Sequence, residues 1–163
     1  MAAFPGGILF VPASLILAAK DEDELAGMLA HAIAHVASRD GARQATRAQL
    51  MDIAMPAPYM GGWTMELGLL RMWRKRELDA DRLAASKMAA AGYDPGALAR
   101  YLDREQASYD EYSPKMYSML PRRAQRIEAI QSVIDTLPAR TYPARDAFSA
   151  FQEQVRRLTV GRY

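Results

Sequence analysis

The sequence predicts an α+β domain that is predominantly helical, and two observations indicate this class. Apolar residues recur at the three- and four-residue spacing of helices in several long segments. One short apolar run, Ile8–Val11, lies between a Gly-Gly pair and a proline, as strands often do. The chain has 163 residues, a length typical of one domain, so we expect 1–163 to form a single domain. Because apolar sequence begins at the first residues, we also expect this domain to be part of a longer protein.

Turn residues divide the chain into one strand and a series of helices. Asp21, with Glu24 three residues later, is typical of a helix N-terminus, and Gly92 is typical of a helix end. Pro56–Gly62 contains two prolines and two glycines and is predicted to be a loop. The chain is expected to begin with a turn at Gly6–Gly7 and the strand Ile8–Val11. Helices are expected at Ser14–Ala19, from Asp21 to about Ser38, from about Gly41 to Ile53, at Thr64–Ala90 and at Pro95–Ser108. After an irregular segment at Glu111–Leu120, we expect a helix that starts at Pro121 and a final amphipathic helix that carries Phe148, Phe151, Val155 and Leu158.

Both histidines of the chain, His31 and His35, lie on the helix predicted after Asp21. Residues four apart lie on one face of a helix, which is the geometry with which one helix gives two imidazoles to one zinc ion. The flanking residues are mostly small and apolar, so this helix is expected to be buried, and buried imidazoles need polar partners. The alternative is a pair of core histidines that bond to neighbouring carbonyl groups.

A second pair at helical spacing, Glu77 and Asp81, lies on the long helix predicted at Thr64–Ala90. Zinc held by two imidazoles requires a third protein ligand, and a carboxylate is common in that place. The aspartate one turn later could accept a hydrogen bond from a ligating imidazole and select its tautomer. The alternative is a solvated helix face, on which the acids of this segment pair with nearby basic residues, Arg74, Lys75 and Arg82.

Composition excludes several kinds of site. The chain has no cysteine, so disulfides and thiolate metal ligands are excluded, and any zinc must be held by histidine and carboxylate. The 21 basic and 19 acidic residues nearly balance, which favours solvated arginine clusters over a nucleic-acid surface. No membrane span is expected, because the most apolar region, Leu50–Leu70, is interrupted by charged residues, prolines and glycines. The apolar N-terminus lacks a basic region, so we interpret it as part of the fold rather than a signal peptide.

Several motifs follow one another in a recognisable order: the Gly-Gly strand, ELAGMLAHAIAHVASRD, RELDADRLA and GYDP. Over roughly Phe4–Ile134, this series resembles the gluzincin zinc metallopeptidases of the CaaX prenyl protease, HtpX and BepA-like type. The resemblance implies a zincin-like peptidase domain with a small edge β-sheet beside the active-site helix. It also implies that Zn²⁺ is held by His31, His35 and Glu77, and that Asp81 supports a ligating imidazole.

Two positions depart from the pattern of these peptidases. Their helix motif is H-E-x-x-H, whose glutamate is the general base, and here Ala32 takes its place and has no proton chemistry. They also commonly carry a His-Pro pair with an arginine a few residues later. Pro121 and Arg126 match that second motif, but Leu120 replaces its histidine. The resemblance implies that Arg126 contacts the transition state or the substrate.

Three hypotheses about function follow from these residues. The first is a zinc-dependent metalloendopeptidase domain that acts on proteins or peptides and is inactive or weak because Ala32 replaces the base. The second is a non-catalytic zinc-containing module, a peptide-binding or chaperone-like pseudo-peptidase, and the third is a metal-free helical domain. The resemblance implies a substrate extended along the cleft beside Ile8–Val11 and a periplasmic or membrane-associated full-length protein.

Overall fold

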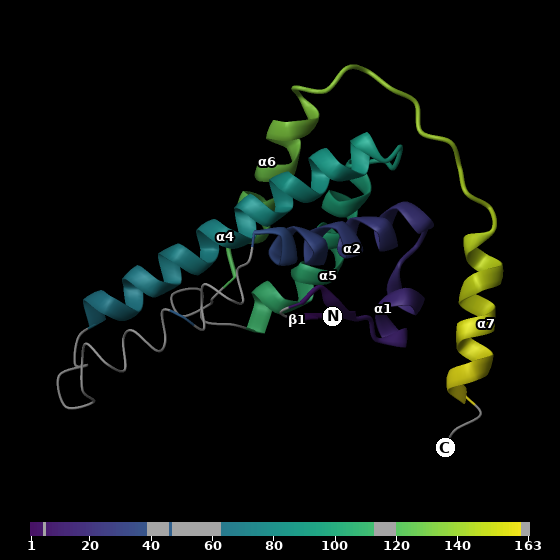
Figure 1. Ribbon diagram of the computed structural model, residues 1–163, viewed down its shortest axis with the longest axis horizontal. Coiled ribbons are helices and arrows are strands. Elements are labelled where there is room, and N and C mark those ends of the chain that lie inside the picture. The colour runs from purple at the N-terminus through teal and green to yellow at the C-terminus, as the bar shows by residue number, and fades with distance from the viewer. Residues whose placement is uncertain (5, 39–45, 47–62, 113–119, 161–163) are drawn as a thin grey trace.

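The computed structural model describes residues 1–4, 6–38, 46, 63–112 and 120–160, and it confirms the predominantly helical α+β class (Figure 1). The elements are β1 (Ala2–Phe4), β2 (Ile8–Phe10), α1 (Ala13–Ala18), α2 (Glu22–Ala37), α4 (Trp63–Ala90), α5 (Gly96–Tyr112), α6 (Arg123–Ile134) and α7 (Phe148–Val160). Apart from Thr46, the helix predicted from about Gly41 to Ile53 lies outside the described residues, as does the loop Pro56–Gly62.

Most predicted helix ends agree with the structure, and the main exception is the end of α5. Gly92 ends the preceding helix with a φ of 82°, and the Tyr93 amide donates to the Met88 carbonyl at 2.9 Å. In contrast, α5 continues past the predicted end at Ser108 to Tyr112, so the first two residues of the segment predicted as irregular are helical. The sequence has no proline or glycine between Ser108 and Pro114, so nothing stops the helix there.

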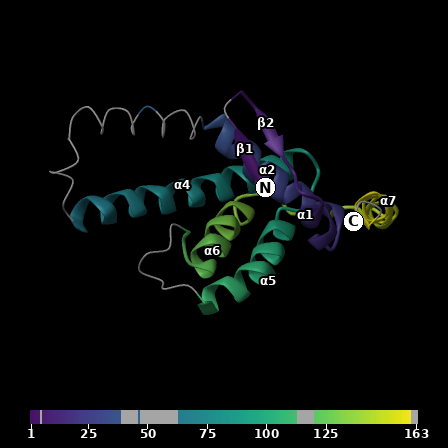
Figure 2. The same cartoon turned by 90° about the horizontal axis from the view of Figure 1, so that it is seen from below.

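The two strands form an antiparallel hairpin in which Ala2 pairs with Phe10 and Phe4 with Ile8. Gly6 and Gly7 turn the chain with φ values of 91° and 87°, a region that residues with a side chain rarely adopt. The strand β1 was not predicted, because three residues carry no periodicity and only the pairing with β2 defines them. It packs on α2, so a small sheet lies beside the helix that carries both histidines (Figure 2).

The hydrophobic core lies where α2, α4, α5 and α6 pack together. Its buried side chains come mainly from α4, α5 and α6, with one from α1. They are Leu15, Ala84, Ala85, Met88, Ala97, Leu98, Tyr101, Leu102 and Ile130. On α2, Gly27 permits a close approach to α5, since a Cβ there would lie 3.0 Å from the Leu98 Cβ. The core also places α2 against α4, the helix that carries Glu77 and Asp81.

The last helix, α7, lies at one side of the molecule and packs on α1 (Figure 1). Phe148 is buried, and the Gln152 amide donates to the carbonyls of Ile16 and Ala19 at 2.9 and 2.8 Å. The predicted helix is confirmed, but its apolar stripe is only partly covered, since Phe151 and Leu158 are exposed. None of the helices in the described ranges combines the length and the apolar character that a membrane span requires.

A buried ion pair joins the N-terminal end of α2 to α5. The Asp21 carboxylate caps α2 as predicted, accepting from the Glu24 amide at 2.7 Å. The Glu24 side chain, 1% exposed, accepts from both terminal nitrogens of Arg104 at 2.8 and 2.7 Å and from the Lys20 amide at 2.7 Å. Burial alone would raise the pKa of Glu24, but these donors outweigh it and hold the pKa below its usual value.

We expect Glu24→Gln to lower the free energy of unfolding by about 2 kcal/mol at pH 7, because it removes the buried charge that accepts two hydrogen bonds from Arg104 and leaves that arginine, among the described residues, only Glu105 as a charged partner. The pKa of Glu24 is lower in the folded protein than in the unfolded chain. The ionised carboxylate therefore stabilises the fold at any pH above the unfolded-state pKa, and this stabilisation is lost as the pH falls through the folded-state pKa. The difference between the two proteins should therefore narrow below about pH 4. Urea unfolding at both pH values tests this. Glu153→Gln, in an exposed pair with Arg156 and Arg157, is the control and should change nothing measurable.

Candidate metal centre

Three side chains from two helices meet in one cluster. His31 and His35 come from α2 and Glu77 comes from α4, and their potential ligand atoms all lie within 4.8 Å of one another. The Nε2 atoms of the two imidazoles are 3.1 Å apart. The carboxylate oxygens of Glu77 lie 3.4 Å from each of these nitrogens. The structure thus brings together the three residues that the sequence singled out.

These separations match a bound metal ion. Histidine nitrogens and carboxylate oxygens bind zinc at about 2.1 Å, so two ligands at the tetrahedral angle are about 3.4 Å apart. The two imidazole nitrogens are 3.1 Å apart, and each lies 3.4 Å from a different oxygen of Glu77, so both rings and the carboxylate approach one another at about that distance. Two neutral imidazoles and one carboxylate are also a donor set that divalent transition metals prefer. The residues therefore fit a metal ion, and three protein ligands would leave the fourth position of a tetrahedral ion to another ligand.

The Glu77 carboxylate is held in its ionised form. Burial raises its pKa, but contacts with the His31 and His35 rings outweigh burial and place the pKa well below its usual range. A metal requires this deprotonated state, so the carboxylate is ready to act as a ligand at neutral pH.

Asp81 lies behind the cluster, one helical turn after Glu77. Its Oδ1 is 2.9 Å from Nδ1 of His31, and that buried nitrogen makes no well-aligned hydrogen bond to another described residue. Burial lowers the pKa of His31, but the nearby carboxylates of Asp81 and Glu77 outweigh it and raise the pKa. Asp81 therefore faces the ring nitrogen opposite to the one directed at Glu77.

Arg126, on α6, pairs with the carboxylate of Asp81. Its Nε donates to Oδ2 of Asp81 and its Nη2 donates to Oδ1, both at 2.7 Å. The arginine is only 6% exposed and Asp81 is completely buried. Burial raises the pKa of Asp81, but the Arg126 guanidinium outweighs it and leaves this pKa below its usual value. A continuous contact chain thus runs from α6 through α4 to α2.

The alternatives raised by the sequence can be compared with this geometry. Asp79 does pair with Lys75 and Arg82, at 3.1 Å each, on an exposed helix face. Glu77 and Asp81 do not belong to that face, because both carboxylates are directed at His31. The histidines likewise have carboxylates as their neighbours, which distinguishes them from core histidines bonded only to carbonyl groups.

Ala32 lies next to His31 on α2 and is buried, at 4% exposure. Its methyl group can neither donate nor accept a proton, so position 32 contributes only helix propensity and packing. Leu120 is half-buried and directly precedes Pro121, ahead of α6. The structure thus has a cluster that could hold a metal ion and has no proton-transfer group at these two positions.

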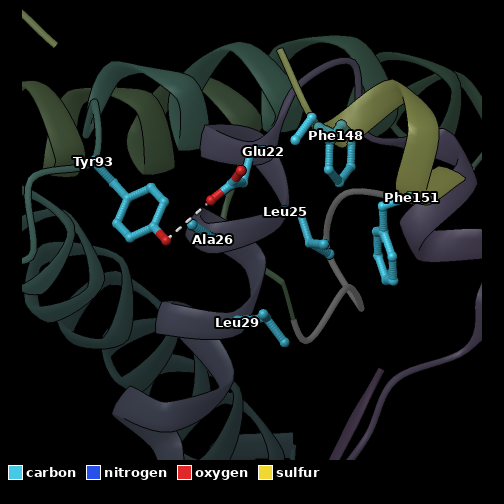
Figure 3. Close-up of a pocket in the computed structure, with 8 residues that line it drawn as sticks. Glu22, Leu25, Ala26, Leu29, Tyr93, Phe148 and Phe151 are labelled. Carbon is cyan, nitrogen blue, oxygen red and sulfur yellow. Dashed lines mark hydrogen bonds between the residues drawn. The ribbon is translucent and has the colours of Figure 1, made fainter. Parts of the chain in front are cut away.

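A concavity lies away from the candidate metal centre, between α2 and α7 (Figure 3). Its volume is about 310 Å³, and its lining is mostly apolar: Glu22, Leu25, Ala26, Leu29, Tyr93, Ala147, Phe148 and Phe151. By helical spacing, the α2 residues of this pocket point away from the face that carries His31 and His35. The hydroxyl of Tyr93 donates to Glu22 at 3.2 Å at one wall (Figure 3). The pocket contains none of the metal-centre residues.

Comparisons with known proteins identify the family to which this chain belongs. Residues 1–134 match the model of peptidase family M48. The chain is 32% identical over 137 residues to the putative beta-barrel assembly-enhancing protease of Vibrio cholerae, which covers 72% of this chain and 28% of that protein.

Two further relatives extend the comparison. The beta-barrel assembly-enhancing protease of Escherichia coli K12 is 27% identical over 146 residues, 77% of this chain and 30% of that protein. The mitochondrial metalloendopeptidase OMA1 of Schizosaccharomyces pombe is 30% identical over 138 residues, 78% of this chain and 41% of that protein. The chain therefore spans less than half the length of each of these relatives. Since the family model covers most of its residues, and His31, His35 and Glu77 lie within the matched part, the chain belongs to peptidase family M48.

Proposed function

We propose that this chain is a zinc metalloendopeptidase domain whose catalytic step is weak because Ala32 occupies the position of the general base. The observation that carries the proposal is the cluster of His31, His35 and Glu77, whose possible ligand atoms lie within 4.8 Å of one another. A metallopeptidase of this type binds its ion through two histidines of one helix and a carboxylate of another. The membership of family M48 agrees with this class of reaction.

Each residue of the site has a defined part in this proposal. Zinc, when bound, supplies a Lewis acid that polarises the peptide carbonyl. His31, His35 and Glu77 hold it, and Asp81 holds the His31 ring by its far nitrogen. What is absent at position 32 is a carboxylate to take up and return a proton, a contribution that is typically worth about 10²- to 10⁴-fold in rate.

The proposed substrate is an unfolded or extended protein segment. The hairpin β1–β2 lies beside α2, and the side chains of Ile8 and Phe10 on β2 are exposed. An extended peptide can add to such an edge through main-chain hydrogen bonds. The relatives are named for β-barrel assembly and for mitochondria. On the family resemblance, we propose a periplasmic or membrane-associated location for the protein that carries this domain.

The second candidate function is a pseudo-peptidase that binds extended peptides without cutting them. Ala32 favours it, since the ligand cluster is retained while the group that completes hydrolysis is missing. Both candidates require zinc and a peptide, so metal content alone does not separate them. The deciding experiment compares cleavage and binding of unfolded casein by the zinc-loaded chain and by zinc-loaded Ala32→Glu. Cleavage by the variant supports the peptidase, whereas binding without any product by both proteins supports the pseudo-peptidase.

We expect Asp81→Asn to weaken zinc binding about 10- to 100-fold, the usual cost of losing the group that orients a histidine ligand. Asparagine has nearly the same shape but no charge, so it holds the His31 imidazole less firmly. Competition with a chromophoric chelator at fixed pH measures the change. Asp79→Asn, on the exposed face of the same helix, is the matched control and should leave the affinity unchanged. An unchanged affinity in Asp81→Asn would remove Asp81 from the metal site.

A further inference from the structure

We propose that Arg126 is a positioning residue of the metal centre: it fixes the Asp81 carboxylate, and through it the His31 ring, and does not contact the substrate. The inference rests on the proposed zinc site and adds to it a residue from a third helix, α6. It also replaces the role expected from the sequence, in which Arg126 contacts the substrate or the transition state.

The first argument is the number of hydrogen bonds that Arg126 directs at one group. Both Nε and Nη2 donate to Asp81, each at 2.7 Å, which is the bidentate arrangement that fixes a carboxylate in position and in rotation. A guanidinium that reached a substrate would need free donors on an accessible side. Arg126 is 6% exposed, so its charge is already committed to a buried partner.

The second argument is that the two contacts of Asp81 meet at one atom. Oδ1 accepts from Nη2 of Arg126 and also lies 2.9 Å from Nδ1 of His31. Without Arg126, a fully buried carboxylate would keep its charge without a cationic partner, which is costly. Asp81 would then be displaced or protonated, and it would hold the ring less firmly. Because the same ring directs Nε2 at the metal cluster, the loss reaches the metal ligand.

The third argument is that the contact spans separate elements. Asp81 and Arg126 are 45 positions apart in the sequence and join α4 to α6, while His31 lies on α2. One chain of contacts therefore fixes the relative placement of the three helices at the site. A structural ion pair of comparable kind, between Arg104 and Glu24, joins α2 to α5 and includes none of the metal-centre residues. This second pair provides a matched control.

The test is a double-mutant cycle on zinc affinity, measured by chelator competition. We expect Arg126→Gln to weaken zinc binding about 10- to 100-fold. Arg126→Lys keeps the charge but loses the bidentate geometry, so its zinc affinity should lie between that of Arg126→Gln and that of the unchanged chain. Adding Arg126→Gln to Asp81→Asn should change the affinity less than about threefold, because Arg126 acts through Asp81. Arg104→Gln, which costs stability elsewhere, should leave zinc affinity within about twofold.

Several outcomes would overturn the inference. These are unchanged zinc affinity in Arg126→Gln, a full additional loss on top of Asp81→Asn, or an equal loss in Arg104→Gln. A substrate contact would instead leave zinc affinity unchanged and raise only the KM of a cleaving variant. If Arg126→Gln fails to fold, zinc affinity is compared instead among Arg126→Lys, Asp81→Asn and the double variant. In the double variant two neutral amides face each other, so no buried charge is left unpaired. His35→Ala tests the zinc site separately, so zinc retention in that variant would refute the proposed function rather than the role of Arg126.

Discussion

Replacing Ala32 with glutamate is expected to raise the rate at which the zinc-loaded chain cleaves unfolded casein by about 10²- to 10⁴-fold. The reason is that the ligand cluster already has the separations of a metal site, whereas position 32, next to His31, carries a methyl group. Glutamate there would restore a proton acceptor on the same helix. The chain with Ala32 provides the baseline, and Ala32→Gln, which has the size of glutamate without its proton chemistry, is the matched control.

Burial at position 32 makes two checks necessary. Ala32 is 4% exposed, so a longer charged side chain must find space or displace its neighbours, and an unpaired buried charge is costly. The thermal stability and zinc content of each variant should therefore be measured before its activity. Failure of a folded, zinc-loaded Ala32→Glu protein to cut any unfolded chain would contradict the expectation.

Leu120 is the second position that departs from the motif pattern that the family resemblance implies. If both groups are required, Ala32→Glu alone has little effect, and Leu120→His combined with it exceeds the sum of the single changes, because groups that act as a unit are non-additive. If none of the zinc-loaded variants, single or double, cuts unfolded chains, the pseudo-peptidase becomes the better-supported function.

The second large effect is expected from the ligands themselves. His35→Ala or Glu77→Ala should weaken zinc binding by more than about 100-fold, beyond the usual cost of losing a supporting group, because each removes one of three protein ligands. Protein purified without a histidine tag should contain about one equivalent of zinc, and each variant should lose it on gel filtration. The measurement is metal analysis of the eluted protein by mass spectrometry.

Asp79→Asn is the matched control for Glu77, since both acids lie on α4 but Asp79 pairs with Lys75 and Arg82 at the surface. It should retain the full equivalent of zinc. Retention of zinc by both ligand variants would show that the ion is held elsewhere in the protein. The metallopeptidase proposal would then be refuted.

The sequence alone determined the features that depend on local spacing. Two histidines four residues apart must lie on one face of any helix that contains them, and the same holds for Glu77 and Asp81. Asp21 at the start of α2 and Gly92 at the end of α4 likewise act through backbone groups within a few residues. Such features can be predicted because no distant part of the chain is needed to define them.

Only the tertiary structure decided which of the acids on α4 belong to the site. Glu77, Asp79 and Asp81 lie within five consecutive residues, and helical spacing alone does not say which face meets α2. The packing of α2, α4 and α6 turns Glu77 and Asp81 inward and leaves Asp79 with its surface cations. That orientation depends on how large buried surfaces fit together, which local propensity does not specify.

The role of Arg126 and the pairing of β1 depended on the tertiary structure for the same reason. Arg126 lies 45 positions from Asp81, and its sequence neighbourhood suggested only a motif arginine, while the contact itself exists because α6 packs on α4. The three residues of β1 become a strand only through their pairing with β2. Helix faces, caps and ligand spacing were thus determined by the sequence, whereas contacts between distant segments required the fold, because their partners are chosen by packing rather than by neighbours in the chain.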